Sequence, residues 1–137
     1  MELINYNFDC CRDCLIFLSN NIFIESNTIK PISWLIVTQD PTLTQKYSEE
    51  TIKYNLLKLQ EQGFIRTNHY TYNQNTGTIA NVHIQDITAD GWNFLCNAKD
   101  NTIWEEAKNQ AVKLKDFGMN VLANLLATLA ANKIMGK

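Results

Sequence analysis

A chain of 137 residues is long enough for one well-buried core with an appendage. Its hydrophobic content of 45% and charged content of 19% are those of an ordinary globular protein and exclude an intrinsically disordered one. Charge is unevenly spread, because residues 1–98 carry six Lys/Arg against ten Asp/Glu, whereas residues 99–137 carry six against four. Since nucleic-acid affinity comes largely from neutralising phosphates, the acidic first part argues against tight binding to DNA of any sequence.

The N-terminal residues MELINYNFD lack the basic start and apolar run of a signal peptide, so we expect a cytoplasmic protein. The four cysteines would there be reduced thiols rather than a disulfide framework. The most apolar segment, Val121 to Ala131, is too short to span a bilayer and contains Asn124, so we expect no membrane partner.

Asp9 can cap a first helix that runs from Cys10 to about Asn20, with its apolar residues at amphipathic spacing. Cys11 and Cys14 lie one turn apart and could share a metal with Cys96 or a histidine. No second close pair of ligands accompanies them. We therefore interpret the cysteines as packed thiols and expect no metal and no cofactor.

The segment from Ile22 to Thr38 contains two apolar runs rich in β-branched residues, IFI and WLIV. We expect one of them to form a short first strand. Asp40 and Pro41 then mark a turn, and Leu43 to Tyr47 has room for a short second helix.

The stretch from Ser48 to Ile65 combines a helix start, an apolar stripe and a helix stop. Ser48 supplies an N-terminal cap, and two glutamates follow it in the first turn. Ile52, Leu56 and Leu59 share one face, and Gly63 can adopt the left-handed conformation that ends a helix. The short spacing from the preceding helix predicts a helix-turn-helix.

With that stripe buried, the opposite face of the third helix would enter the major groove of DNA. The residues expected to read bases are Thr51, Tyr54, Asn55 and Lys58. The residues expected to touch phosphates are Lys46, Lys53 and Arg66. Each side chain also has a simpler interpretation as part of a solvated polar face, and for Lys53 and Lys58 we favour that interpretation.

Two segments alternate between apolar and polar residues on either side of a turn at Asn73 to Gly77: Phe64 to Tyr72 and Thr78 to Thr88. This pattern predicts a β-hairpin, the wing. The turn, NQNTG, contains no Lys or Arg to hold a DNA backbone.

Thr88 caps the next predicted helix, Ala89 to about Ala98, and a further helix runs from Ile103 until Gly118 ends it.

The last predicted helix, Met119 to about Met135, has a wide apolar stripe that requires a partner surface. It can pack back on the same chain or pair with a second copy, and a membrane-surface helix ranks third because few lysines line its polar face. We favour self-association through Val121, Leu122, Leu125, Leu126, Leu129 and Ile134.

Three segments, DCCRDCLIFLSNN, YSEETIKYNLLKLQEQGFI and ITADGWNFLCNAKDNTIW, together resemble an uncharacterised winged-helix family found in phages, prophages and mobile elements of Gram-positive bacteria. The residues that match the family's second signature are Thr88, Gly91, Phe94, Leu95 and Trp104. Three positions depart from it, with Asp90 in place of Glu, Trp92 in place of His and Lys99 in place of Arg. If the family histidine were chemically active, Trp92 would remove that activity here.

The sequence therefore predicts an α+β winged helix-turn-helix over residues 1–98 and a helical extension over residues 99–137. The first functional hypothesis is a dimeric DNA-binding transcription regulator of phage or prophage origin, acting on double-stranded DNA. The alternative is a protein-interaction module that keeps the scaffold without binding DNA, with a host or phage protein as its partner. An enzyme is not expected, because the sequence has no Gly-rich phosphate loop, no metal-ligand spacing and no carboxylate pair near a histidine.

Overall fold

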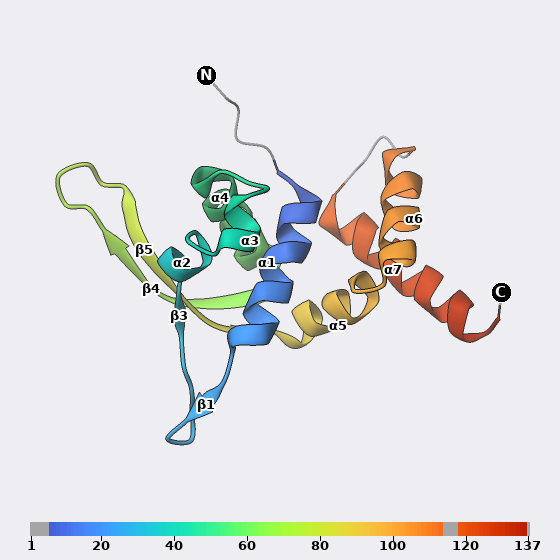
Figure 1. Ribbon diagram of the computed structural model, residues 1–137, viewed down its shortest axis with the longest axis horizontal. Coiled ribbons are helices and arrows are strands. Elements are labelled where there is room, and N and C mark those ends of the chain that lie inside the picture. Colours follow the sequence, from blue (N-terminus) through green and yellow to red (C-terminus); the bar gives the residue numbers. More distant parts are fainter. Residues whose placement is uncertain (1–5, 114–117, 137) are drawn as a thin grey trace. The chain divides into compact units, whose positions relative to one another are not determined.

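The computed structural model describes residues 6–113 and 118–136 and has a mixed α+β fold (Figure 1). The chain divides into two compact units, Met1–Gly91 and Trp92–Lys137. Helix α5 (Ala89–Ala98) crosses the division, whereas the boundary expected from the sequence, between residues 98 and 99, follows the end of that helix.

The first unit contains the helices α1 (Phe8–Asn21), α2 (Trp34–Val37), α3 (Pro41–Thr44) and α4 (Glu49–Glu61). The expected cap of α1 is wrong: Asn7 caps the helix, its side-chain oxygen accepting from the backbone N–H of Cys10 at 3.0 Å. Asp9 lies in the first turn instead, where its charge suits the helix dipole. The cap of α4 is confirmed, because Ser48 Oγ accepts from the N–H of Thr51 at 3.2 Å.

The apolar run WLIV forms the helical turn α2 and not a strand, because the Ser33 hydroxyl accepts from the N–H of Leu35 at 3.2 Å and caps it. The strands β1 (Ile24–Glu25) and β2 (Thr28–Ile29) form a separate two-stranded hairpin. The first strand of the main sheet is β3 (Ile32–Ser33), which lies between the two predicted runs.

The predicted long hairpin is confirmed as β4 (Ile65–Tyr72) and β5 (Ile79–Ile87). The sheet is antiparallel, in the order β3-β5-β4, and pairs Ile32 with Ile84 and Ile65 with Ile87. Helices α1 and α4 pack against each other, and α1 also contacts β5 while α4 contacts β4. Their apolar faces and the inner face of the sheet form the core, whose members include Cys10, Cys14, Leu15, Leu18, Ile52, Leu56, Leu59, Ile65, Val82, Ile84 and Ile87.

The second unit contains α6 (Asn101–Val112) and α7 (Met119–Ile134), which pack against each other. Asp100 caps α6 by accepting from the N–H of Ile103 at 3.0 Å, and Lys113 is the C-cap. The predicted continuation of this helix over residues 114–117 lies outside the described residues. None of the helices in the described ranges has the length and apolar character needed to cross a membrane.

The packing of α7 corrects the expected self-association surface. Leu122 and Leu126 are fully buried within the chain, so they cannot contact a second copy. Val121, Leu125 and Leu129 are half-buried, and Ile134 is exposed. The apolar stripe of α7 is therefore largely used within the chain, where α6 lies along it.

Candidate functional site on helix α4

The solvent-facing side of α4 carries three of the four side chains expected to read DNA bases. Thr51, Tyr54 and Lys58 are all half-buried there. Lys58 Nζ lies 5.2 Å from the centre of the Tyr54 ring and 2.8 Å from a carboxylate oxygen of Glu61. The hydrogen bond to Glu61 raises the pKa of Lys58, so its charge is matched within the same helix.

The expectation that Asn55 reads a base is wrong, because this side chain has no exposed surface. Its oxygen accepts from the backbone N–H of Asn7 at 2.9 Å and lies 3.4 Å from the thiol of Cys11. Its amide nitrogen donates to the carbonyl of Thr51 at 2.8 Å. Asn55 therefore joins α4 to the start of α1.

Every cation that the sequence assigned to DNA forms an ion pair inside the first unit. Lys53 pairs with Glu49 at 2.9 Å, one turn away on α4, and its ammonium also lies 5.1 Å from the centre of the Trp34 ring. Arg66 pairs at 3.3 Å with Asp86, its cross-strand neighbour. Together with the pair of Lys58 and Glu61, these contacts match each of the three cations with a carboxylate of the same unit.

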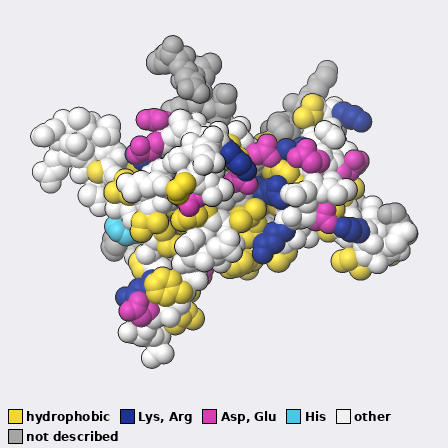
Figure 2. All heavy atoms as spheres, in the orientation of Figure 1, with side chains coloured by type: hydrophobic (Ala, Val, Ile, Leu, Met, Phe, Trp, Pro, Cys, Tyr) yellow, Lys and Arg dark blue, Asp and Glu magenta, His cyan; other side chains and the backbone are white. Residues whose placement is uncertain are grey.

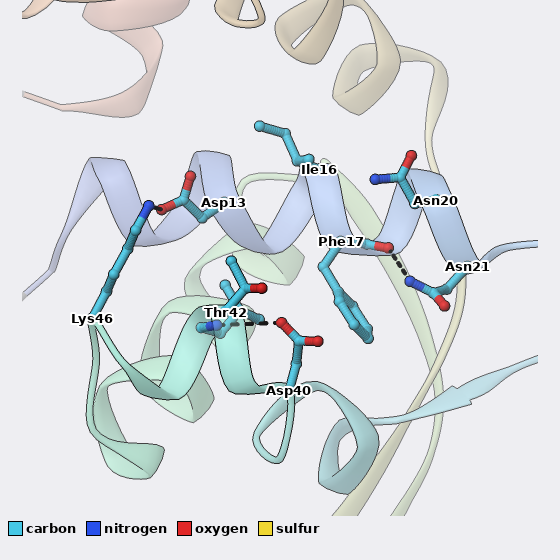
Figure 3. A pocket seen from close by; sticks show the side chains of 9 residues that line it. Asp13, Ile16, Phe17, Asn20, Asn21, Asp40, Thr42 and Lys46 are labelled. Carbon is cyan, nitrogen blue, oxygen red and sulfur yellow. Dashed lines mark hydrogen bonds and ion pairs between the residues drawn. The ribbon is translucent and has the colours of Figure 1, made fainter.

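Lys46 completes the set at the edge of a pocket between α1 and α3 (Figure 3). Its ammonium lies 3.4 Å from the carboxylate of Asp13. The same carboxylate accepts from the hydroxyl of Tyr47 at 2.7 Å. Burial, followed by this hydrogen bond, raises the pKa of Tyr47 above its usual range. Lys46 is thus directed to Asp13.

The pocket itself has a volume of about 350 Å³, and several of its polar groups are bonded within the unit. Asp40 accepts from the N–H of Leu43 at 3.2 Å, and Asn21 donates to the carbonyl of Phe17 at 2.7 Å (Figure 3). These bonds stabilise the end of α1 and the start of α3. The lining presents Ile16 and Phe17 beside these bonded polar groups.

Three of the four cysteines lie in the core on α1. Cys10, Cys11 and Cys14 are fully buried, and the sulfurs of Cys10 and Cys14 are 4.0 Å apart. Burial raises the pKa of Cys11, and the hydrogen bond with Cys10 raises that of Cys14. Both thiols are therefore protonated at neutral pH and behave as small apolar side chains.

The junction between β5 and α5 explains the residues that carry the family signature. Thr88 Oγ1 donates to the carbonyl of Gly63 at 2.5 Å and accepts from the N–H of Gly91 at 3.0 Å, which confirms it as the cap of α5. A Cβ at Gly91 would lie 2.1 Å from the carbonyl oxygen of Phe64, so only glycine fits. Phe94 and Leu95 are buried. The signature is thus structural at these positions.

A family model described as a hypothetical protein, DUF2513, matches residues 5–117. The chain belongs to the DUF2513 family. The matched range includes α1, α4 and the Thr88 junction, so the segments that carried the sequence resemblance lie within the DUF2513 region. No curated protein and no solved structure matches the chain. At the position of Trp92, this DUF2513 member presents a partly exposed indole ring.

The four carboxylates that neutralise the cations were missed by the sequence reasoning. Two of the pairs could have been found, because Glu49 with Lys53 and Lys58 with Glu61 have the one-turn spacing of helical ion pairs. The pairs of Lys46 with Asp13 and Arg66 with Asp86 join segments distant in sequence, and no local signal identifies them.

Proposed function

We propose that this DUF2513 protein is a non-enzymatic protein-interaction module built on a winged-helix scaffold and working in a phage or prophage setting. Support for the scaffold comes from the order of elements, in which α1, α3 and α4 precede the hairpin β4–β5 and β3 adds a short third strand. In this proposal α4 is the third helix of the winged helix and β4–β5 is the wing.

The observation that carries the proposal is the pairing of all four candidate cations, Lys46, Lys53, Lys58 and Arg66, with carboxylates. A phosphate backbone gains affinity from cations whose only counterions are mobile salt ions, which binding releases. Here each cation would first have to leave a carboxylate, and that carboxylate would then face the phosphates. The pairing therefore supports a partner without dense negative charge.

The surface of α4 has the composition of a protein-binding face. The partly exposed Tyr54 ring lies beside the Lys58 ammonium, so an aromatic ring is combined with a matched charge, while Lys53 lies over the buried ring of Trp34. Aromatic side chains with a polar end are enriched at protein interfaces because they bury large area and still satisfy a hydrogen bond. A host or phage protein is the partner that this face suits.

A DNA-binding regulator remains the second candidate, because Thr51, Tyr54 and Lys58 share one face of α4 and have groups able to contact base edges. Surface ion pairs are individually weak, and a phosphate can replace a carboxylate. This candidate requires that the binding energy of a specific site exceeds the repulsion from Glu49 and Glu61.

Titrating a mixed-sequence duplex with the protein at two salt concentrations separates the two candidates by fluorescence anisotropy. The interaction module should give no binding at low salt. Micromolar binding that weakens steeply with salt would contradict it and favour the regulator. The variant Lys53→Glu with Lys58→Glu then shows whether α4 is in the interface, because binding through this helix should disappear.

Photo-crosslinking in bacterial cells tests the interaction module directly, with a benzophenone amino acid in place of Tyr54. The expected result is a discrete protein adduct, identified by mass spectrometry. The same substitution at Tyr72, an exposed side chain at the end of β4, is the matched control and should not give that adduct. A nucleic-acid adduct at position 54, or the same protein adducts at both positions, would contradict the proposal.

A further inference from the structure

The short hairpin β1–β2 between α1 and β3 is the most exposed apolar feature of the first unit. All four of its strand residues are exposed, with Ile24 at 71%, and Phe23 just before it is 54% exposed. Ile24 and Ile29 lie opposite each other in the register, so their side chains share one face. A two-stranded ribbon of this length gains little stability alone.

The hairpin stands away from the body of the unit (Figure 1). A hollow of about 360 Å³ lies on one side of it and is lined by Asn21, Phe23, Glu25, Lys30, Pro31, Ile32 and Ile36. A second hollow separates the hairpin from β4 and β5 and is lined by Asn27, Thr28, Ile29, Arg66, Gln85 and Asp86. Ser26 and Asn27 in the turn both have positive φ, the pair of conformations found in type I′ hairpins.

The first hollow combines apolar lining with one acid and one base. Phe23, Pro31 and Ile36 supply the apolar surface, and Glu25 and Lys30 lie around it. In Figure 2 apolar, acidic and basic side chains lie together on the projecting hairpin. The face is thus neutral overall but carries separated opposite charges.

We propose that this hairpin face, defined by Phe23, Glu25, Lys30 and Ile36, is the surface through which two copies of the chain associate. A two-fold axis brings the same patch of both copies together. Every contact between two different residues therefore forms twice, once in each direction. Glu25 of each copy then meets Lys30 of the other. Phe23, exposed beside a hollow large enough for an aromatic ring, enters the hollow of the second copy.

Charge complementarity favours a second copy over another occupant. A strongly acidic or basic partner would be attracted by one of the two charged side chains and repelled by the other. A second copy in two-fold arrangement satisfies both with no further requirement. The inference does not rest on the α4 proposal, because it uses a different surface of the unit.

The test is the mass of the full chain by light scattering coupled to size exclusion, from about 1 to about 200 μM, since small interfaces are weak. The expected result is a concentration-dependent rise toward twice 15.7 kDa. Glu25→Lys and Lys30→Glu should each shift the association midpoint upward at least tenfold. The double variant Glu25→Lys with Lys30→Glu should restore association, because it re-forms both pairs in reversed sense.

Two further variants keep the test decisive. Phe23→Asp should give a monomer with unchanged circular dichroism, since Phe23 is largely exposed. Ile134→Asp, at the 86% exposed end of α7, should leave the dimer unchanged. A monomeric wild type across the range would overturn the proposal. So would a dimer that tolerates the hairpin variants but is lost on Leu125→Asp with Leu129→Asp, because it would place association on α7.

Discussion

Asn55 is the residue whose role differs most from its place in the sequence pattern. It lies in the core and links three groups: the backbone N–H of Asn7, the thiol of Cys11 and the carbonyl of Thr51. Its spacing of three from Ile52 and of four from Leu59 puts it on the buried stripe, so periodicity indicated the buried face and only its polar side chain suggested the other. A polar residue on such a stripe is buried when the fold offers it partners.

Asn55→Ala should reduce the free energy of unfolding by about 1–3 kcal/mol, because a buried N–H on Asn7 loses its acceptor. Chemical denaturation followed by circular dichroism measures the change. Gln60→Ala, also on α4, is the matched control and should change stability by less than about 0.5 kcal/mol. Equal stability of the two variants would show that the Asn55 network is not stabilising.

Gly91 is the second residue with a sharp prediction. Gly91→Ala places a methyl group against the backbone carbonyl of Phe64 and should cost about 2 kcal/mol or more, because backbone must move to relieve the contact. Gly118→Ala is the control, since a Cβ there meets nothing within 4 Å. Thermal melts compare the two variants, and a Gly91→Ala protein as stable as the control would contradict the close approach.

Among the elements, those with local start and stop signals were predicted best. The N-terminal cap of α4, the hairpin β4–β5 and the start of α5 at Thr88 are confirmed because each is determined by residues within a few positions. The sequence did not decide between strand and helix for the run WLIV, because four apolar residues suit a helical turn as well as a strand. The burial of Leu122 and Leu126 depends on α6 and could not be read from α7 alone.

The contact between α6 and α7 carries a prediction on pH. Asp100 caps α6 and accepts a hydrogen bond from Lys133 on α7. That bond, followed by the backbone bond from Ile103, lowers the pKa of Asp100. A carboxyl with a lowered folded-state pKa stabilises the fold above its unfolded value, and the contribution is lost as pH falls through the lowered value.

Thermal unfolding of the wild type and Asp100→Asn should therefore differ at pH 7, with the wild type more stable. The difference should shrink as the pH falls below 3.8, the ordinary pKa of an aspartate, because the carboxyl then becomes protonated in both states. Asn keeps the oxygen that caps α6, so the comparison isolates the loss of the charged oxygen that bonds Lys133. A difference that stays constant down to pH 2 would assign the effect to the shape of the cap.

At the scale of the whole molecule, the balance of charge decides between the proposed partners. Residues 1–98 carry six Lys/Arg against ten Asp/Glu, and the structure places four of those acids directly on the candidate cations. The net charge was readable from the sequence. The pairing of the four cations with carboxylates could not be predicted in full, because half of the pairs bring together residues from separate elements.

Glu49→Gln with Glu61→Gln releases Lys53 and Lys58 from their carboxylates and should create weak DNA binding that falls with salt. The slope of log affinity against log salt should steepen by about 0.9 for each phosphate contacted. Glu50→Gln with Glu106→Gln makes the same change of net charge without breaking any of the four ion pairs and serves as the control. Equal binding by both double variants would show that net charge, and not release of the α4 cations, controls affinity.

The bond between Asn7 and Asn55 also constrains the order of events during synthesis. The ribosome delivers α1 well before α4, yet the backbone N–H of Asn7 has no acceptor within the protein until residue 55 has emerged. The first helix of the nascent chain can be capped locally by Asn7, but it cannot be joined to α4 through this bond while α2 and α3 are made. Closure of the N-terminal unit waits for the middle of the chain.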